Sequence, residues 1–235
     1  MEDARQLIEL TKALTNRRKR RMRAELREAF GEAMSVPRRH RDELDCVESD
    51  QAFVVLKPEG SMTRERFEAD ALRPLLRQAV VAIAAAVETY VADRACGMVG
   101  PALRGLQLPK RLREMAITLG DVKDVEAAYE RRNWGYRAIV ETTLRKQASA
   151  APNQVGIVFS TVGVDELWKR VDAQRKVKKG TSHGELSALA ERRNLIAHSA
   201  DWSGRGRASL SSAEVDTFFD TSYEIVEAIE RVVEG

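Results

Sequence analysis

The stretch SHGELSALAERRNLIAHS, residues 182–199, decides how the chain folds. Ser182 followed three residues later by Glu185 is typical of a capping box, in which each side chain satisfies a backbone donor that the other leaves open. We therefore expect a helix to begin near His183. Its apolar face is formed by residues that recur at helical spacing, namely Leu186, Leu189, Ala190 and Ala197.

Arg193 interrupts this apolar face. A helix advances by about 100° per residue, so Arg193 falls about 20° from Leu186, in the middle of the stripe. An arginine is almost never fully buried without a partner. The guanidinium therefore reaches past its neighbours to solvent, pairs with a carboxylate or lines a polar cavity, and the third arrangement would make it part of a site.

A second question is whether His198 can lie close to Arg193. On an ideal helix Arg193 and His198 lie about 140° apart, whereas Asn194 and His198 share a face. For the guanidinium and the imidazole to meet, the helix must end or loosen near Ala197, or the partner must come from a second chain. The polar, Gly-containing segment after His198 favours an end there, and a helix C-terminus favours a protonated imidazole.

The rest of the chain is also helical in pattern. Helices are expected over Ala4–Gly31, Leu103–Leu119, Val122–Ala148 and from Asp165 to about Val177. Another is expected to start at about Glu65 and to be closed by Gly97 and Gly100-Pro101. A last helix is expected from a capping box at Ser211–Glu214 to the end of the chain. Residues Ser35–Ser61 and Pro152–Gly163 break the pattern. The sequence thus predicts an all-α protein built around a helical bundle, with an irregular insertion at Ser35–Ser61 between the first two helices. We divide it into a basic N-terminal helix and insertion, residues 1–60, packed on the bundle, and a helical domain, residues 61–235.

The helix that starts near Glu65 carries the strongest amphipathic stripe of the chain. The stripe consists of Leu72, Leu75, Leu76, Ala79, Val80, Ile83, Ala84, Val87 and Val91. Glu88 follows Val87 and is the acidic residue best placed to meet a buried Arg193. The alternative is that Glu88 simply faces solvent.

The composition is that of a soluble globular protein. At 235 residues, with 43% hydrophobic and 32% charged residues, the chain can bury a substantial core. Its longest apolar run, Ala79–Val87, is too short to span a membrane, and the acidic start Met1–Asp3 lacks a signal region. We therefore expect a cytoplasmic protein without a membrane partner.

The two cysteines, Cys46 and Cys96, do not make a disulfide framework. Neither has metal-ligand spacing to a histidine, the three histidines being His40, His183 and His198. We interpret both as reduced thiols, and we expect no metal site and no cofactor.

The net charge of +3 hides an asymmetry. Residues 1–41 contain 12 Lys and Arg against 6 Asp and Glu, a balance of +6 that leaves −3 for the remainder. Within this part lies a basic patch made of Arg17, Arg18, Lys19, Arg20, Arg21 and Arg23. It is either a solvated helix face or a surface that binds RNA phosphates, and it has no interleaved aromatic residues to stack bases.

A helix ending in Arg-Asn-x-x-x-His, then a short polar loop and a capped amphipathic helix, resembles the HEPN family, in particular its RiboL-PSP type. The residues that carry the resemblance are Glu191–His198 and the last helix, Ser212–Val233. The helix Leu75–Arg94, with Glu88 in its middle, adds weaker support, and the similarity covers roughly residues 160–235. HEPN proteins are helical bundles, and many of them are RNases.

The resemblance implies a metal-independent endoribonuclease that acts as a homodimer with the motif at the interface. His198 would be the general acid/base, Arg193 would stabilise charge on the phosphorane, and Asn194 would orient the imidazole or the phosphate. Glu88 joins this site as the partner of Arg193. An imidazole titrates near neutral pH, and a guanidinium is a bidentate phosphate binder, so these residue types suit the chemistry.

The implied substrate is RNA, including tRNA, because a 2′-hydroxyl is the nucleophile and the products carry 2′,3′-cyclic phosphate and 5′-hydroxyl ends. The resemblance further implies a role in stress, toxin–antitoxin systems or antiviral (phage) defence, with a cognate antitoxin or defence partner. Ala200 stands where some family members have a Tyr, two residues after the motif His.

Two alternatives remain beside the nuclease. Arg193 could merely pair with Glu88 or another carboxylate while His198 caps the helix C-terminus. The chain could also be a catalytically silent HEPN-like module that dimerises and binds a protein or a nucleic acid through the basic patch. Side-chain tips of Arg193 and His198 within about 6 Å across an open cleft of a dimer favour the enzyme, whereas a closed, fully paired Arg193 favours the module.

Overall fold

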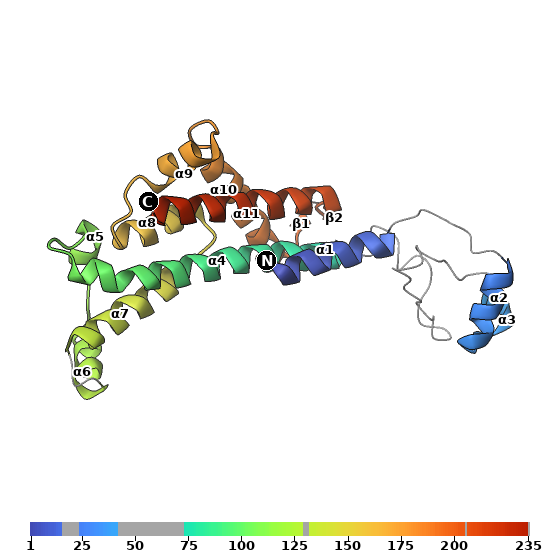
Figure 1. Cartoon of the computed structure of the whole chain (residues 1–235), viewed down its shortest axis with the longest axis horizontal. Helices are drawn as coiled ribbons and strands as arrows, with labels where there is room; N and C mark the ends of the chain where they lie inside the picture. Colours follow the sequence, from blue (N-terminus) through green and yellow to red (C-terminus); the bar gives the residue numbers. More distant parts are fainter. Residues whose placement is uncertain (16–23, 42–72, 129–131, 205, 235) are drawn as a thin grey trace. The chain divides into compact units, whose positions relative to one another are not determined.

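The fold is all-α, as predicted. A computed structural model describes residues 1–15, 24–41, 73–128, 132–204 and 206–234, and within these ranges it contains eleven helices and two strands of two residues each (Figure 1). The helices are α1 (Glu2–Thr15), α2 (Ala24–Ala33), α3 (Arg38–Arg41), α4 (Arg73–Arg104), α5 (Lys110–Arg113), α6 (Leu119–Ala128), α7 (Arg132–Gln147), α8 (Pro152–Thr161), α9 (Leu167–Arg175), α10 (Thr181–Ser199) and α11 (Ser212–Glu234). Strands β1 (Trp202–Ser203) and β2 (Gly206–Arg207) pair antiparallel, with Trp202 opposite Arg207.

The chain divides into two compact units. One contains Met1–Glu9 and Leu75–Gly235, and the other contains Leu10–Pro74. The boundary that we predict at residue 60 lies in 42–72, outside the described residues, and stays a prediction. The helix expected over Ala4–Gly31 is seen as α1 and α2 on either side of residues 16–23, which are also outside the described part of the chain.

The second unit contains α2 and α3, and its described part is held by one buried cation. Arg41 donates to the backbone carbonyl of Val36 and pairs with Glu28. Gly31 makes room for it, because a Cβ at that position would lie 2.6 Å from the Arg41 Cδ. α3 thus forms inside the predicted insertion, and the rest of that insertion, from residue 42, lies outside the described residues.

Helix α4 is the core helix of the first unit. Its buried face packs in one cluster with apolar residues of the other helices, including Ile83 and Val87 of α4, Val158 and Phe159 of α8, Leu186 and Leu189 of α10, and Ile225 and Ile229 of α11. By length and composition α4 could cross a membrane, and half of its most apolar window is buried inside the unit. The Tyr90 hydroxyl and Arg94 both bond Glu230, which ties α4 to α11.

The expected end of α4 at Gly97 and Pro101 is wrong. The helix continues to Arg104 because Val99 is fully buried and Leu103 packs on the core, so tertiary packing overrides the weak helix propensity of glycine and proline. The helix expected over Leu103–Leu119 does not form as one helix. Within this range the structure has the last residues of α4 and the single turn of α5. Val122–Ala148 holds two helices, α6 and α7, rather than one.

The break expected over Pro152–Gly163 is also wrong, because this segment forms α8. Pro152 occupies the first turn, where a proline costs no intrahelical hydrogen bond. Val155, Val158 and Phe159 then follow at helical spacing and are fully buried. A short apolar run does not distinguish a buried helix from an extended segment by its pattern alone.

Asp172 of α9, rather than the expected capping box, starts the motif helix α10. The helix begins at Thr181, so Ser182 lies inside it, and the Asp172 carboxylate accepts from the backbone N–H groups of Gly180 (2.6 Å) and Ser182 (3.0 Å). Glu185 is bound instead by Arg175. Burial raises the pKa of Asp172, but the hydrogen bonds from Ser182 and Gly180 and the charge of Arg175 outweigh it and bring this pKa below its ordinary value.

The second capping box is confirmed at the start of α11. The backbone N–H of Ser211 donates to the Glu214 carboxylate (2.8 Å), and the backbone N–H of Glu214 donates to the Ser211 hydroxyl (3.2 Å). The hydrogen bond from the Ser211 backbone lowers the pKa of Glu214. Helix α11 therefore begins where the capping box predicts it. Helices α9 and α10 also lie where helical periodicity predicts them.

The substitution Asp172→Asn tests the cap of α10. It should reduce the free energy of unfolding by about 2 kcal/mol near pH 7, because a cap and its charge-assisted hydrogen bonds each contribute on that order. The folded pKa of Asp172 is depressed, so its stabilisation is present above the unfolded value of about 3.9 and is lost as the pH falls through the lower folded value.

Urea unfolding at a series of pH values measures this difference. The gap between wild type and Asp172→Asn should close in acid, while Asp220→Asn, at an exposed position of α11, should change little at any pH. A gap that stays constant down to about pH 2 would mean that the carboxylate charge is not what stabilises the helix start.

Candidate functional site

Helix α10 stays helical through the whole motif. It runs to Ser199, and the chain then turns through two residues with left-handed backbone, Ala200 (φ 49°) and Asp201 (φ 65°). The carbonyl of Leu195 accepts from the Asp201 N–H (3.0 Å) and from the Ser199 hydroxyl (2.6 Å). The loosening near Ala197 that would bring Arg193 and His198 together within one chain does not occur.

Arg193 meets Glu88, the carboxylate that the sequence places nearest to it. The Arg193 Nη2 lies 3.4 Å from the Glu88 Oε1, and Nη1 donates to the Asn194 Oδ1 at 3.1 Å. The side chains of Arg193 and Glu88 are 34% and 26% exposed. Arg193 is therefore paired with a carboxylate and half-buried, which is the second of the three arrangements that the sequence leaves open, and part of its guanidinium faces solvent.

His198 and Asn194 are both exposed on the last two turns of α10, one helical turn apart. No described residue forms a hydrogen bond or an ion pair with the His198 ring. The imidazole is thus available to a ligand or to a second chain, whereas Arg193 points to α4 from a position about 140° around the helix. The structure brings Glu88, Arg193 and Asn194 together and leaves His198 apart from them.

A second cluster, which sequence reasoning missed, fixes the end of α10. The Asp201 carboxylate is fully buried, and its Oδ2 accepts from the Arg77 Nε (2.8 Å) and from the Arg192 Nη2 (2.9 Å). Arg77 also donates to the carbonyl of Ala208 (3.1 Å) and Arg192 to that of Ser209 (2.7 Å). We call Arg77, Arg192 and Asp201 the Asp201 clamp.

The Asp201 clamp joins α4, α10 and the hairpin that follows. Two guanidinium groups share one carboxylate, so the cluster keeps a net positive charge beside the motif. The arginine side chains are only 7% and 17% exposed, for Arg77 and Arg192, and the Asp201 Oδ1 and the Arg192 Nε have no hydrogen-bond partner. Arg192 is therefore more deeply buried than its neighbour Arg193, which the sequence analysis places in the candidate site. Nothing in the local pattern could single out Asp201, because its partners come from positions 77 and 192.

The basic patch, Arg17–Arg23, lies within residues 16–23, outside the described residues, and its role in RNA binding stays a prediction. Among the residues that the structure does describe, no group of three or more His, Cys, Asp and Glu side chains could hold a metal ion. Cys96 is a buried free thiol whose pKa is raised by burial, and Cys46 lies outside the described ranges.

Comparison with known proteins returns no relatives. No protein-family model matches the chain, no curated protein matches it, and no solved structure matches its fold. The function therefore has to be argued from the site itself.

Asp201→Asn tests the clamp. The substitution should lower the free energy of unfolding by about 3 kcal/mol, because removing one partner of a buried ion pair leaves the other charges uncompensated. Denaturant unfolding of the full chain measures the loss. Glu227→Gln, which breaks the exposed pair with Arg231 on α11, is the matched control and should cost less than about 1 kcal/mol. Equal effects of the two substitutions would contradict the structural role of Asp201.

Proposed function

We propose that the chain is a HEPN-like helical bundle and a metal-independent endoribonuclease. The observation that carries the proposal is the arrangement at the end of α10, where a partly exposed Arg193 is oriented by Glu88 beside Asn194, and an exposed His198 lies one helical turn beyond Asn194. A fixed guanidinium for the phosphate and an unpaired imidazole for proton transfer are the two groups that cleavage through the 2′-hydroxyl requires.

The same geometry argues for a dimer. Because α10 is an unbroken helix to Ser199, Arg193 and His198 of one chain point in directions about 140° apart. We propose that a two-fold axis near the end of α10 places Arg193 of one chain beside His198 of its twin, so that a dimer has two such sites. Trp202, exposed in the hairpin next to this helix end, is the type of side chain that is enriched at interfaces.

In the proposed reaction the 2′-oxygen forms a bond to phosphorus while the bond between phosphorus and the 5′-oxygen breaks. The His198 imidazole accepts the proton of the 2′-hydroxyl, and the 5′-oxygen takes up a proton from the imidazolium or from water. Arg193 stabilises the negative charge that accumulates on the phosphorane. Glu88 holds the guanidinium in place, and Asn194 orients the imidazole or the phosphate.

The substrate, location and cellular role are proposed from the resemblance to the HEPN family. We propose RNA, including tRNA, as the substrate, a cytoplasmic location, and a role in stress, toxin–antitoxin or antiviral defence with a cognate antitoxin or defence partner. The basic patch, Arg17–Arg23, would supply phosphate contacts to the RNA.

One observation favours a second function. Arg193 is already engaged by Glu88 and Asn194, as a purely structural arginine would be. A catalytically silent HEPN-like module would dimerise through the same face and bind a protein or a nucleic acid. It would show salt-sensitive binding through the basic patch without cleaving RNA.

Substitution of His198 separates these two functions. The purified wild-type protein should nick structured RNA in the presence of EDTA, and the fragments should carry 2′,3′-cyclic phosphate and 5′-hydroxyl ends. His198→Ala should slow nicking by a factor of about 100 to 10,000, the range expected when a general acid/base is removed. Gel analysis of end-labelled RNA measures the rate and the end chemistry.

His40→Ala, which removes a histidine from the other unit, is the matched control and should leave the rate unchanged. The melting temperature of His198→Ala should equal that of wild type, because His198 is exposed. If His198→Ala nicks RNA as fast as wild type, the activity does not come from this site; if no protein nicks RNA, the silent module is the better description.

A further inference from the structure

A second candidate site lies at the opposite end of α10 from His198. Helices α5, α8 and the start of α9 enclose an open groove of about 860 Å³, which we call the α5–α8–α9 groove. This volume is within the range of about 300–1,000 Å³ that is usual for ligand sites. The groove lies entirely within the first unit.

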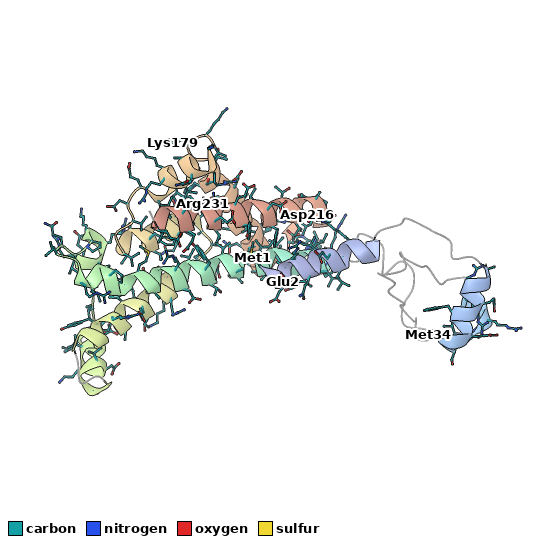
Figure 2. The ribbon with its side chains drawn as sticks, viewed as in Figure 1. Met1, Glu2, Met34, Lys179, Asp216 and Arg231 are labelled. Atoms are coloured by element: carbon teal, nitrogen blue, oxygen red, sulfur yellow. The ribbon has the colours of Figure 1, made fainter. Side chains whose placement is uncertain are left out.

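The groove carries more cations than acidic groups. Lys110 and Arg111 of α5 and Lys179, which Figure 2 places on the loop between α9 and α10, line the groove without a described hydrogen-bond or ion-pair partner. Lys169 is paired with Glu166 at 2.9 Å, so the remaining acidic group of the lining is Asp165. The lining keeps a net charge of +2, which favours an anionic ligand.

One aromatic side chain, Trp168, lines the groove and is held in place by its neighbours. Trp168 donates its indole N–H to the Pro152 carbonyl (2.9 Å) and packs edge-on against the His183 ring. His183 in turn shares a 3.0 Å hydrogen bond with Asn153, which also lines the groove. Gly156 adds no side chain beside the indole, where a Cβ would contact the Trp168 Nε1 at 3.4 Å.

We infer that the α5–α8–α9 groove binds a segment of single-stranded RNA. Cations on the rim match phosphates, and the indole and the apolar wall match a base. Asn153, whose Oδ1 is bonded to the His183 ring, offers its amide N–H groups to a base edge. An acidic peptide would match the cations but would leave the indole of Trp168 unused. The choice of RNA over other polyanions that carry planar aromatic groups rests on the proposed function.

The position of the groove gives it a role in binding rather than in cleavage. His183 beside the groove and His198 are 15 residues apart on one helix, a distance of about 22 Å along its axis at 1.5 Å per residue. A strand held in the groove must follow α10 over that distance to reach His198. The groove would therefore hold long substrates and would lower their KM without changing kcat.

The test removes the three unpaired cations. The probe is a 12-nucleotide oligouridine that contains 4-thiouridine, and the background is His198→Ala, so that the probe is not cleaved. Lys110→Gln/Arg111→Gln/Lys179→Gln should reduce the salt slope of binding by about 2, at about 0.7 for each single-strand phosphate contact, and should weaken binding at 0.1 M salt by roughly 100-fold. Irradiation should crosslink the probe to the segment 152–169.

The control removes the same number of exposed cations of the same unit away from the groove, in Arg5→Gln/Lys146→Gln/Arg231→Gln; Arg5 and Arg231 are in exposed pairs with Glu9 and Glu227. This triple variant should keep the crosslink and most of the affinity. Equal losses in the two triple variants, crosslinks that avoid 152–169, or stronger binding of oligoglutamate than of oligouridine would overturn the inference.

The same experiments distinguish a failure of the proposed nuclease function from a failure of the groove proposal. A wild-type protein that does not nick RNA, but whose His198→Ala variant still crosslinks through the groove, rejects the nuclease and keeps the binding site. A wild-type protein that nicks RNA with an unchanged KM in the groove variant keeps the nuclease and rejects the groove.

Discussion

The carboxylate of Asp201, fully buried between two guanidinium groups, is the interaction on which the candidate site depends. It joins the N-terminal part of α4 to the end of α10 and to the hairpin after it. Ala200 and Asp201 both adopt left-handed backbone, which costs about 1 kcal/mol or more for each residue that is not glycine. Such a turn persists only where its surroundings fix it, and Arg77 and Arg192 do so here.

This fixed end has a direct consequence for the chemistry. Because α10 stays helical through Ala197, the imidazole of His198 and the guanidinium of Arg193 keep the angular separation of a regular helix. Glu88 holds Arg193 against α4, and His198 extends from another side of α10. Under the proposed function, a single chain therefore presents the two halves of the site, and a second copy is required to join them.

Local patterns predicted the elements around the site well. Helical periodicity placed α10 and α11, and the reciprocal bonds of Ser211 and Glu214 are those expected of a capping box. The acidic residue expected beside Arg193, Glu88, is its partner in the structure. These features depend on residues a few positions apart, or on which face of a helix a charge occupies, and a sequence shows both directly. The catalytic roles of these residues stay predictions.

The features that could not be predicted depend on partners that are distant in the sequence. Asp172 replaces Ser182 as the cap of α10, and Asp201 is satisfied by Arg77, 124 positions away. Burial also overrode local signals, since α4 continues through Pro101 and the apolar run after Pro152 forms α8. In each case the packing of the whole unit decides between choices that the local sequence leaves nearly equal.

The central claim is that Arg193 and His198 act together across two chains, and mixed dimers test it most directly. Arg193→Ala and His198→Ala homodimers should each be inactive. Co-folding the two variants in equal amounts should restore about a quarter of the wild-type nicking rate, because half of the dimers are mixed and each of these has one intact site of two. A mixture that stays as inactive as its components, although it forms mixed dimers, would contradict the claim.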